Sequence, residues 1–423
     1  MTSNRPTEVD VMVSATIPNG STVSPVDAST VPPKAAAPEN VLVESNPTSP
    51  NVGESDTIAS GKGQFALSGS AGPTLPEGRL NSETRSKTNL TISIVVPIRN
   101  EARSIEKTLR QLMTQQYDRS KFEVIVVDGE STDGTSDLVR KFATRCGNIV
   151  LLSNRKRLSS AARNIGIRHA RGEIILIVDG HCEMPDDRML ENLVRAFEVS
   201  GADCVGRPQP LGMTHATTLQ KAIARARSSR LGHHPDSFVY SSRPQFVPAG
   251  SVAVAYRREV FARVGYFDES FDACEDYEFN HRCDKAGLCC YLEPEVAVRY
   301  EPRGSLHGLF RQLVRYGRGR IRLLRKHPDT LGIKTLLPAV FVSGCVTLPL
   351  AAWLWPSLLP ACLGVLATYG VIVLLVSIWI SQHFREPRLL PWLPLVFLTV
   401  HVAAGIGLLI EACRPWRGFQ LSS

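Results

Sequence analysis

The stretch Gly172-Glu173-Ile174-Ile175-Leu176-Ile177-Val178-Asp179-Gly180-His181-Cys182-Glu183 is an apolar run that ends in two potential metal ligands. The apolar residues 174–178 predict a strand covered on both faces, and Gly180 permits a sharp turn directly after it. Open parallel sheets bind ligands at the carboxyl ends of their strands. Asp179 and His181 would therefore offer one oxygen and one nitrogen to a divalent cation; the alternative is an Asp-Gly turn beside an exposed His.

Strands and helices alternate before this stretch. The residues that precede it contain three further β-rich runs and three amphipathic segments with helical spacing of their apolar residues. The expected strands are 90–97, 122–127 and 148–152, and the expected helices are 101–116, 134–144 and 159–170. This order predicts a doubly wound α/β sheet with Asp128 and Asp179 at its carboxyl edge.

The pattern is more irregular from residue 184 to residue 300. We expect helices at 187–199, 219–231 and 257–264, strands at 204–206 and 251–256, and a loop over the site at 232–250, which contains three prolines. A further helix opens at Glu275 and Asp276, so these two acidic groups would lie at its positive N-terminal end.

The two ends of the chain differ from its centre. Residues 1–88 are rich in Ser, Thr, Pro, Ala, Gly and Asn and predict a disordered tail. Residues 305–330 are basic and amphipathic, which favours an interfacial helix on anionic lipid headgroups. The apolar segments 336–355, 358–380 and 389–409 each have about the 20 residues that cross a bilayer.

The charge and composition of the chain indicate which kinds of molecule it binds. The 423 residues carry a net charge of +8, but the basic residues gather around the apolar segments and lack the aromatic pattern of RNA-binding modules. We therefore expect membrane lipids or phosphorylated ligands as partners, and no nucleic acid. The ten cysteines show no zinc spacing and predict a reducing compartment.

Several motifs together resemble the nucleotide-sugar half of inverting family 2 glycosyltransferases. They are Ser93-Ile94-Val95-Val96-Pro97 with Asn100-Glu101, Val126-Val127-Asp128-Gly129-Glu130-Ser131-Thr132-Asp133-Gly134-Thr135, Ala162-Arg163-Asn164-Ile165-Gly166, Asp179-Gly180-His181 and Glu275-Asp276. The resemblance covers about 91–302 and implies a GT-A-like mixed sheet flanked by helices, followed by C-terminal transmembrane helices. The Asp-Gly-His variant and Tyr316-Gly317-Arg318-Gly319-Arg320 are most similar to succinoglycan-type exopolysaccharide glucosyltransferases.

The resemblance implies roles for individual residues. Asp276, with Glu275 beside it, would take the proton from the attacking hydroxyl; the alternative is that both complement a helix dipole. Asp179 and His181 would hold the metal at the departing diphosphate. The expected substrate-binding residues are Pro97, Asn100, Glu101, Asp128 at the uracil ring, Arg163, Asp179, Gly250 at the acceptor, and Arg315 and Arg318 at a diphosphate or at lipid headgroups.

Three departures from the family pattern affect the expected chemistry. Asp128-Gly129 replaces the usual Asp-Asp at the second strand, which affects the expected contacts with the base. His181 replaces the usual second aspartate of the metal motif, and nitrogen ligation favours Mn²⁺ over Mg²⁺. The processive synthases carry a Gln-x-x-Arg-Trp signature, whereas this sequence has Gln312-Leu313-Val314-Arg315-Tyr316. We therefore expect addition of a single sugar, with a processive polysaccharide synthase as the alternative.

The sequence thus predicts four regions: a tail (1–88), a GT-A glycosyltransferase domain (89–304), an interfacial segment (305–330) and a membrane domain (331–423). The expected activity is inverting transfer of a hexose from a UDP-sugar to a polyprenyl-diphosphate-linked saccharide or a polysaccharide, at the cytoplasmic side of the cell inner membrane. The non-enzyme alternative is a membrane scaffold that binds a nucleotide sugar. A dinucleotide oxidoreductase is disfavoured because no Gly-x-Gly-x-x-Gly follows the first strand.

Overall fold

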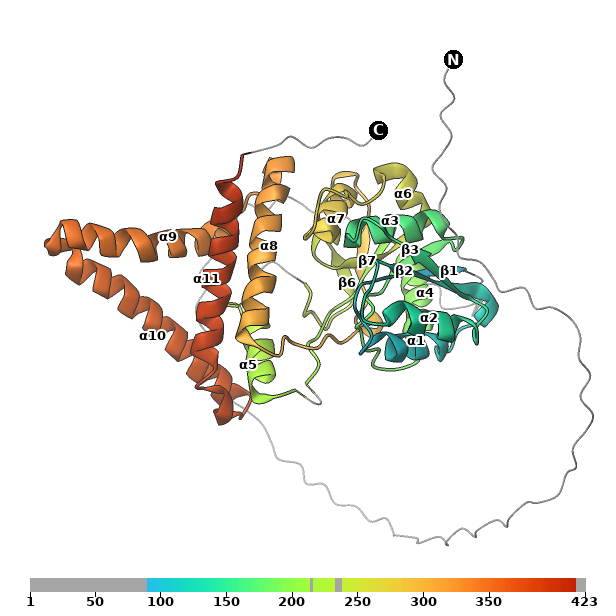
Figure 1. The fold of residues 1–423 in the computed structure, drawn as a ribbon, viewed down its shortest axis with the longest axis horizontal. Helices are drawn as coiled ribbons and strands as arrows, with labels where there is room; N and C mark the ends of the chain where they lie inside the picture. Colours follow the sequence, from blue (N-terminus) through green and yellow to red (C-terminus); the bar gives the residue numbers. More distant parts are fainter. Residues whose placement is uncertain (1–89, 214–215, 233–237, 416–423) are drawn as a thin grey trace, which may run out of the picture. The chain divides into compact units, whose positions relative to one another are not determined.

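The computed structural model describes residues 90–213, 216–232 and 238–415 (Figure 1). The predicted N-terminal tail lies outside the described residues. The strands are β1 (Ile92–Ile98), β2 (Phe122–Asp128), β3 (Ile149–Ser153), β4 (Ile174–Ile177), β5 (Cys204–Gly206), β6 (Gln245–Val247), β7 (Ala253–Arg257) and β8 (Cys290–Leu292). They form one mixed sheet in the order β3-β2-β1-β4-β7-β5-β8-β6.

Helices cover both faces of this sheet. The helices of this part are α1 (Ile105–Met113), α2 (Thr135–Ala143), α3 (Ser159–His169), α4 (Met189–Ser200), α5 (Thr218–Arg227), α6 (Arg258–Val264) and α7 (Glu275–Lys285). Apolar residues of α1, α2 and α4 pack with alternate residues of β1 on one face, whereas α3, α6 and α7 pack on the other. Successive side chains of a strand point to opposite faces, so both sides of a doubly covered strand must be apolar. The predicted α/β fold is confirmed.

The strand pairing changes from parallel to antiparallel between β4 and β7. The strands β1 to β4 pair in parallel, as the alternating pattern predicts, but β7 runs antiparallel to both β4 and β5. The helix that follows β7 along the chain is α6, and α7 begins near the cavity described below. The sheet is therefore parallel in its first half and mixed in its second.

The predicted loop at 232–250 is partly regular. Its residues 245–247 form the edge strand β6, which pairs with β8, and residues 249–251 form the short helix η2 (Ala249–Ser251). The strand expected at 251–256 accordingly begins at Ala253. Residues 245–247 are a strand because they pair with β8. The three prolines of the segment predicted a loop and did not indicate this pairing.

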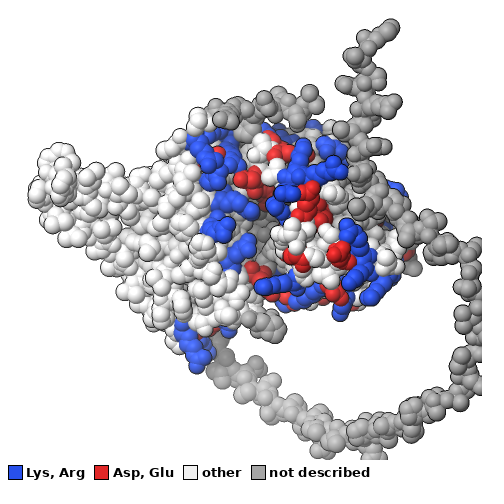
Figure 2. Space-filling model, viewed as in Figure 1, with Lys and Arg blue, Asp and Glu red and all other residues white. Residues whose placement is uncertain are grey.

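Four long helices follow the sheet: α8 (Leu306–Lys326), α9 (Ile333–Leu354), α10 (Leu359–His383) and α11 (Leu393–Ala412). Within the described residues, α9, α10 with its preceding turn, and α11 are long and apolar enough to cross a membrane. Ile333 and Trp353 of α9 are 85% and 76% exposed, and Figure 2 shows the surface of these helices almost without charged side chains. A surface of this kind fits lipid rather than water.

The basic helix α8 packs along α11, where glycines bring the two backbones together (Figure 1). A Cβ on Gly407 would lie 2.3 Å from the carbonyl oxygen of Val314, and one on Gly317 would lie 2.4 Å from that of Ala404. Leu309 and Leu313 precede Gly317 on the same face of α8 and join a cluster with residues of α5, α10 and α11. The contact of α8 with lipid headgroups and the division into four regions stay predictions.

The Gly407→Ala variant should lower the thermal stability of the detergent-solubilised protein. The added methyl cannot fit between α8 and α11, and overpacking of this kind costs about 1–3 kcal/mol. The matched control is Gly370→Ala in α10, where no atom lies within 4 Å of the added Cβ. Thermal unfolding is measured by tryptophan fluorescence. Equal Tm values for the two variants would contradict the packing argument.

Candidate active site

A cavity of about 1180 Å³ opens at the carboxyl ends of β1 and β4. Its walls come from the sheet edge, the start of α7, the middle of α8, and the residues that lead into α9. It contains most of the residues that the sequence singled out. These are Pro97, Glu101, Arg163, Asp179, His181, Gly250, Glu275, Asp276 and Arg315.

Asp179 lies directly after β4, at the start of the turn that Gly180 allows. The hydroxyl of Tyr300 donates a hydrogen bond of 2.7 Å to its Oδ2. Burial raises the pKa of the Asp179 carboxyl, but Arg163, His181 and the Tyr300 hydrogen bond outweigh this effect, so that its pKa is lowered overall. Asp179 is therefore an anionic oxygen donor at neutral pH.

His181 is held in place by Glu101. Its Nδ1 lies 2.9 Å from Glu101 Oε1, and its ring packs edge-on to Tyr300 with 5.6 Å between centroids. The hydrogen bond with Glu101 raises the pKa of His181. A carboxylate on one ring nitrogen is the usual arrangement around a metal-ligating His, because it leaves the other nitrogen for the ion. The chemistry of Asp179 and His181 suits two ligands of a divalent cation, and their ligation of an ion stays a prediction.

Arg163 lies between two carboxylates from different elements. Its Nη1 is 3.4 Å from Glu275 Oε1 and its Nη2 is 3.9 Å from Asp179 Oδ1. Burial lowers the pKa of the guanidinium, but Glu275, Asp179 and Asp276 more than reverse this, and its pKa is raised. Its Nε finds no partner among the described residues. Arg163 therefore joins the β4 and α7 sides of the cavity.

Glu275 and Asp276 begin α7 but have different environments. Glu275 is 7% exposed, and burial raises its pKa, opposed by Arg163 and assisted by Asp276. Asp276 is exposed and lines the cavity. The preceding residue, Cys274, has a φ of 64°, and this turn brings both carboxylates to the N-terminus of the helix. Oδ1 of Asp276 accepts a hydrogen bond of 2.8 Å from the N–H of Tyr277, and within the described residues Asp276, unlike Glu275, has no ion pair.

Gly250 lies in η2, close to α7. Its N–H donates to Asp284 Oδ2 at 3.0 Å, and an added Cβ would lie 3.2 Å from that oxygen. Asp284 also accepts from the N–H of Ala249 at 2.7 Å. Gly250 therefore lies in close contact with Asp284 in the cavity wall, and its role at the acceptor stays a prediction.

Three predicted site residues do not line the cavity. The carboxylate of Asp128 accepts hydrogen bonds from Ser131 and Ser136 at the start of α2. The side chain of Asn100 binds the same loop, because its Oδ1 accepts a hydrogen bond of 2.9 Å from the N–H of Thr132. The guanidinium of Arg318 pairs with Glu411 of α11 at 3.0 Å. Their predicted contacts with substrate stay predictions, and all three have structural partners.

Sequence reasoning missed Arg207, which lines the cavity directly after β5. It is 1% exposed, and its Nε and Nη1 have no hydrogen-bond partner among the described residues. A buried guanidinium without partners is costly unless a ligand supplies them. A position just after the carboxyl end of a strand is the one sequence feature that could have indicated Arg207 as a site residue. The strand before it, β5, has only three residues and gives a weak sequence pattern.

Further basic and aromatic groups come from α8. Arg315, Tyr316 and Arg320 line the cavity, and the guanidinium carbon of Arg320 lies 4.2 Å from the ring centroid of Tyr277. The lining continues to Leu331, Gly332 and Thr335 at the start of α9. The cavity thus combines carboxylates and guanidinium groups, and it reaches the helix that can enter a membrane.

The chain is similar to glycosyltransferases in sequence and in structure. The model of the family Glycosyl transferase family 2 matches residues 93–265. The chain is 33% identical over 303 residues to the succinoglycan biosynthesis protein ExoA of Rhizobium meliloti, covering 70% of this chain and 87% of that protein. It is 30% identical over 237 residues to the glycosyltransferase AglE of Haloferax volcanii, covering 55% and 73%. Among solved structures, the mannosyltransferase PcManGT of Pyrobaculum calidifontis, in complex with GDP-Man and Mn²⁺, is 22% identical with a TM-score of 0.47, covering 75% and 87%.

The Arg163→Met variant should be destabilised by about 3 kcal/mol, because it leaves Asp179 and Glu275 without their buried counter-charge. Adding Glu275→Gln should restore part of the loss. The control is Arg145→Met, an exposed residue just after α2, which should change the stability by less than about 0.5 kcal/mol. Thermal unfolding measures all of these, and an Arg163→Met protein as stable as the control would contradict the role of Arg163.

Proposed function

The chain belongs to Glycosyl transferase family 2, and on this premise we propose that it transfers a hexose from a UDP-sugar to a lipid-linked or growing polysaccharide acceptor with inversion at the anomeric carbon. It is a glycosyltransferase, not a non-catalytic scaffold or a dinucleotide oxidoreductase. One observation supports the proposal above others. Asp179 and Asp276 line the same cavity, with Arg163 between Asp179 and the neighbour of Asp276.

The carboxylate of Asp276 is the proposed base. It accepts the proton of the acceptor hydroxyl while that oxygen bonds to the anomeric carbon and the bond to the β-phosphate oxygen breaks. Glu275 is engaged with Arg163, which leaves Asp276 as the free carboxylate of the pair. No covalent intermediate is needed for a single displacement with inversion.

The leaving nucleoside diphosphate needs positive charge around it. Asp179 and His181 are the proposed ligands of a divalent cation, Mn²⁺ in preference to Mg²⁺, whose chemistry when bound is to neutralise charge on the departing diphosphate. Arg163 and Arg207 line the same cavity with unpartnered guanidinium nitrogens among the described residues. A guanidinium matches the geometry of phosphate oxygens, so these two residues are proposed to orient the donor.

The proposed acceptor carries a polyprenyl diphosphate. The cavity is lined by Arg315 and Arg320 and continues to Gly332 and Thr335 at the start of α9. An acceptor whose diphosphate lies at these arginines would keep its polyprenyl chain beside the apolar helices. The basic residues of α8 favour a cytoplasmic face of the inner membrane for the catalytic part.

A processive synthase is the second candidate. Gln312, Arg315 and Tyr316 occupy the positions of the processive signature and all line the cavity, with Gln312 donating to the Tyr316 hydroxyl at 3.1 Å. The length of the product separates the two candidates. Addition of one sugar per acceptor supports single transfer, and a ladder of longer products supports the synthase.

The Asp276→Asn variant should lose transfer by about 100- to 10,000-fold, because an amide cannot accept the proton. Its binding of UDP should be retained. Membranes with lipid-linked acceptors and a panel of radiolabelled UDP-sugars provide the assay, with Asp179→Ala beside it. The control is Asp137→Asn, an exposed residue of α2 paired with Arg140. Full transfer by both Asp276→Asn and Asp179→Ala would overturn the assignment of the site.

Arg315 and Arg318 form a matched pair on one helix. The Arg315→Ala variant should raise the KM for the acceptor about tenfold with little change in Tm, because its side chain is exposed to the cavity. Arg318→Ala should instead lower the Tm, since it removes a partner of the buried Glu411. The reverse outcome, with only Arg318→Ala affecting KM, would contradict this assignment.

A further inference from the structure

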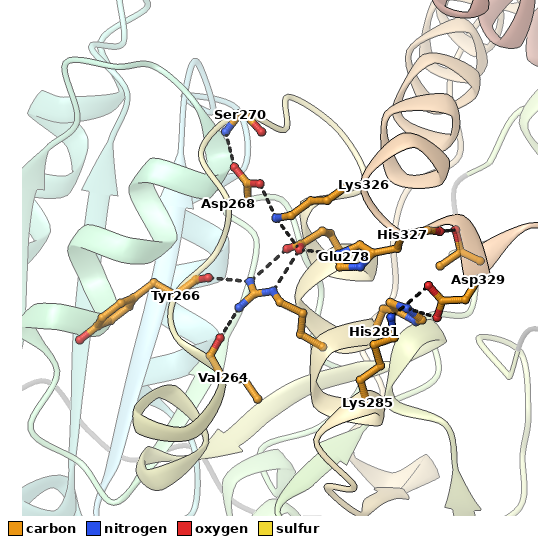
Figure 3. A network of polar contacts seen from close by, with 12 residues as sticks. Val264, Tyr266, Asp268, Ser270, Glu278, His281, Lys285, Lys326, His327 and Asp329 are labelled. Carbon is orange, nitrogen blue, oxygen red and sulfur yellow. Dashed lines mark hydrogen bonds and ion pairs between the residues drawn. The ribbon is translucent and has the colours of Figure 1, made fainter. Parts of the chain in front are cut away.

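A second group of potential metal ligands lies where α7, α8 and η4 (Pro328–Thr330) meet (Figure 3). His281, His327 and Asp329 each offer one ligand atom, and these atoms lie within 4.8 Å of one another. No other group of three or more His, Cys, Asp or Glu ligands of this compactness occurs in the described part of the chain. None of these residues belongs to the Asp179 and His181 pair.

The contact between His281 and Asp329 has the spacing of two ligands of one ion. His281 Nε2 lies 3.0 Å from Asp329 Oδ2. This nitrogen is buried and makes no hydrogen bond of acceptable direction among the described residues. Donor atoms of a tetrahedral zinc site, each about 2.0–2.1 Å from the ion, are about 3.3 Å apart. A metal ion would satisfy the nitrogen without a large movement of either side chain.

His327 is oriented by a buried carboxylate. Its Nε2 lies 3.0 Å from Oε1 of Glu278, which is fully buried. Glu278 is also bound by Arg282 and by Lys326, at 3.0 and 2.8 Å, so it is a carboxylate and the ring nitrogen facing it carries the proton. The other ring nitrogen, Nδ1, then has its lone pair available. A His held by a carboxylate in this way is the arrangement that supports metal ligation.

Asp329 has a second partner that does not compete for the same oxygen. Lys285 Nζ lies 3.0 Å from Oδ1, whereas His281 contacts Oδ2 (Figure 3). A metal bound through Oδ2 therefore leaves the Lys285 contact in place. Lys285 is half exposed, and its long side chain can also turn into solvent.

We propose that His281, His327 and Asp329 bind a transition-metal ion, with Zn²⁺ the best match, and that this ion fixes α7 to the segment that leads into α9. Two imidazoles and one carboxylate suit Zn²⁺, whereas Mg²⁺ requires oxygen ligands in octahedral geometry. His281 lies five residues after Asp276 on the same helix, His327 follows the end of α8, and Asp329 precedes α9. The ion would thereby hold the helix that carries Asp276 in position relative to the apolar helices.

The test is the metal content and thermal stability of the full chain, purified in detergent without a polyhistidine tag. After treatment with a chelator and reloading with Zn²⁺, the His181→Ala variant, which lacks a ligand of the other proposed cation site, should still bind about one Zn²⁺. Zn²⁺ should raise the Tm, since an ion bound only by the folded state stabilises it. Asp329→Asn and His281→Ala should lose both the ion and the rise in Tm.

Two controls separate ligation from unfolding. Lys285→Ala removes a neighbour that is not a ligand and should keep the ion. Loading with Co²⁺ should give visible absorption bands in wild type and in Lys285→Ala, and none in Asp329→Asn, whose side chain is exposed and whose fold should persist. The proposal is overturned if the wild type binds no ion tightly, or if Asp329→Asn and His281→Ala keep the wild-type Zn²⁺ content.

Discussion

The buried guanidinium of Arg163 lies between the carboxylates of Asp179 and Glu275, and the catalytic cavity depends on this contact. Asp179 follows β4 and Glu275 opens α7, so the contact joins the parallel half of the sheet to the helix that follows its mixed half. Any of the three charges alone would be unfavourable at this depth. The guanidinium offsets part of the negative charge of the two carboxylates, which permits the two acidic elements to line one cavity.

Helix α8 connects this cavity to the membrane helices. Gly317 and Val314 bring it against α11, whereas Gly319 approaches Ala273 and Cys274 at the start of α7. Gly319 lies on the same face of α8 as Arg315, Tyr316 and Arg320, which line the cavity. Glu411 of α11 is neutralised by Arg318 and Arg322, and Arg322 also binds Asp272. Several of the basic residues of α8 therefore make contacts within the protein.

Several features of the fold and the site followed from local pattern. Apolar runs such as 174–178 identify strands covered on both faces, because each side chain direction must meet a helix. The motifs with Asp179, His181 and Glu275-Asp276 indicated the site, and the structure brings these residues to one cavity. The motifs predicted that Asp128 and Asn100 contact the substrate. In the structure Asp128 accepts hydrogen bonds from Ser131 and Ser136, and Asn100 accepts one from Thr132.

By itself, the sequence determined the α/β fold, the three apolar helices and the family, because periodicity, segment length and motif order are local properties of the chain. Only the tertiary structure decided that two nitrogens of the buried Arg207 guanidinium have no hydrogen-bond partner among the described residues, that Arg318 binds Glu411, and that residues 245–247 form the edge strand β6. It also brought His281 together with His327 and Asp329 across about 45 residues of sequence. The physical reason is that burial and charge pairing depend on which distant segments come into contact, and no spacing within one segment encodes that.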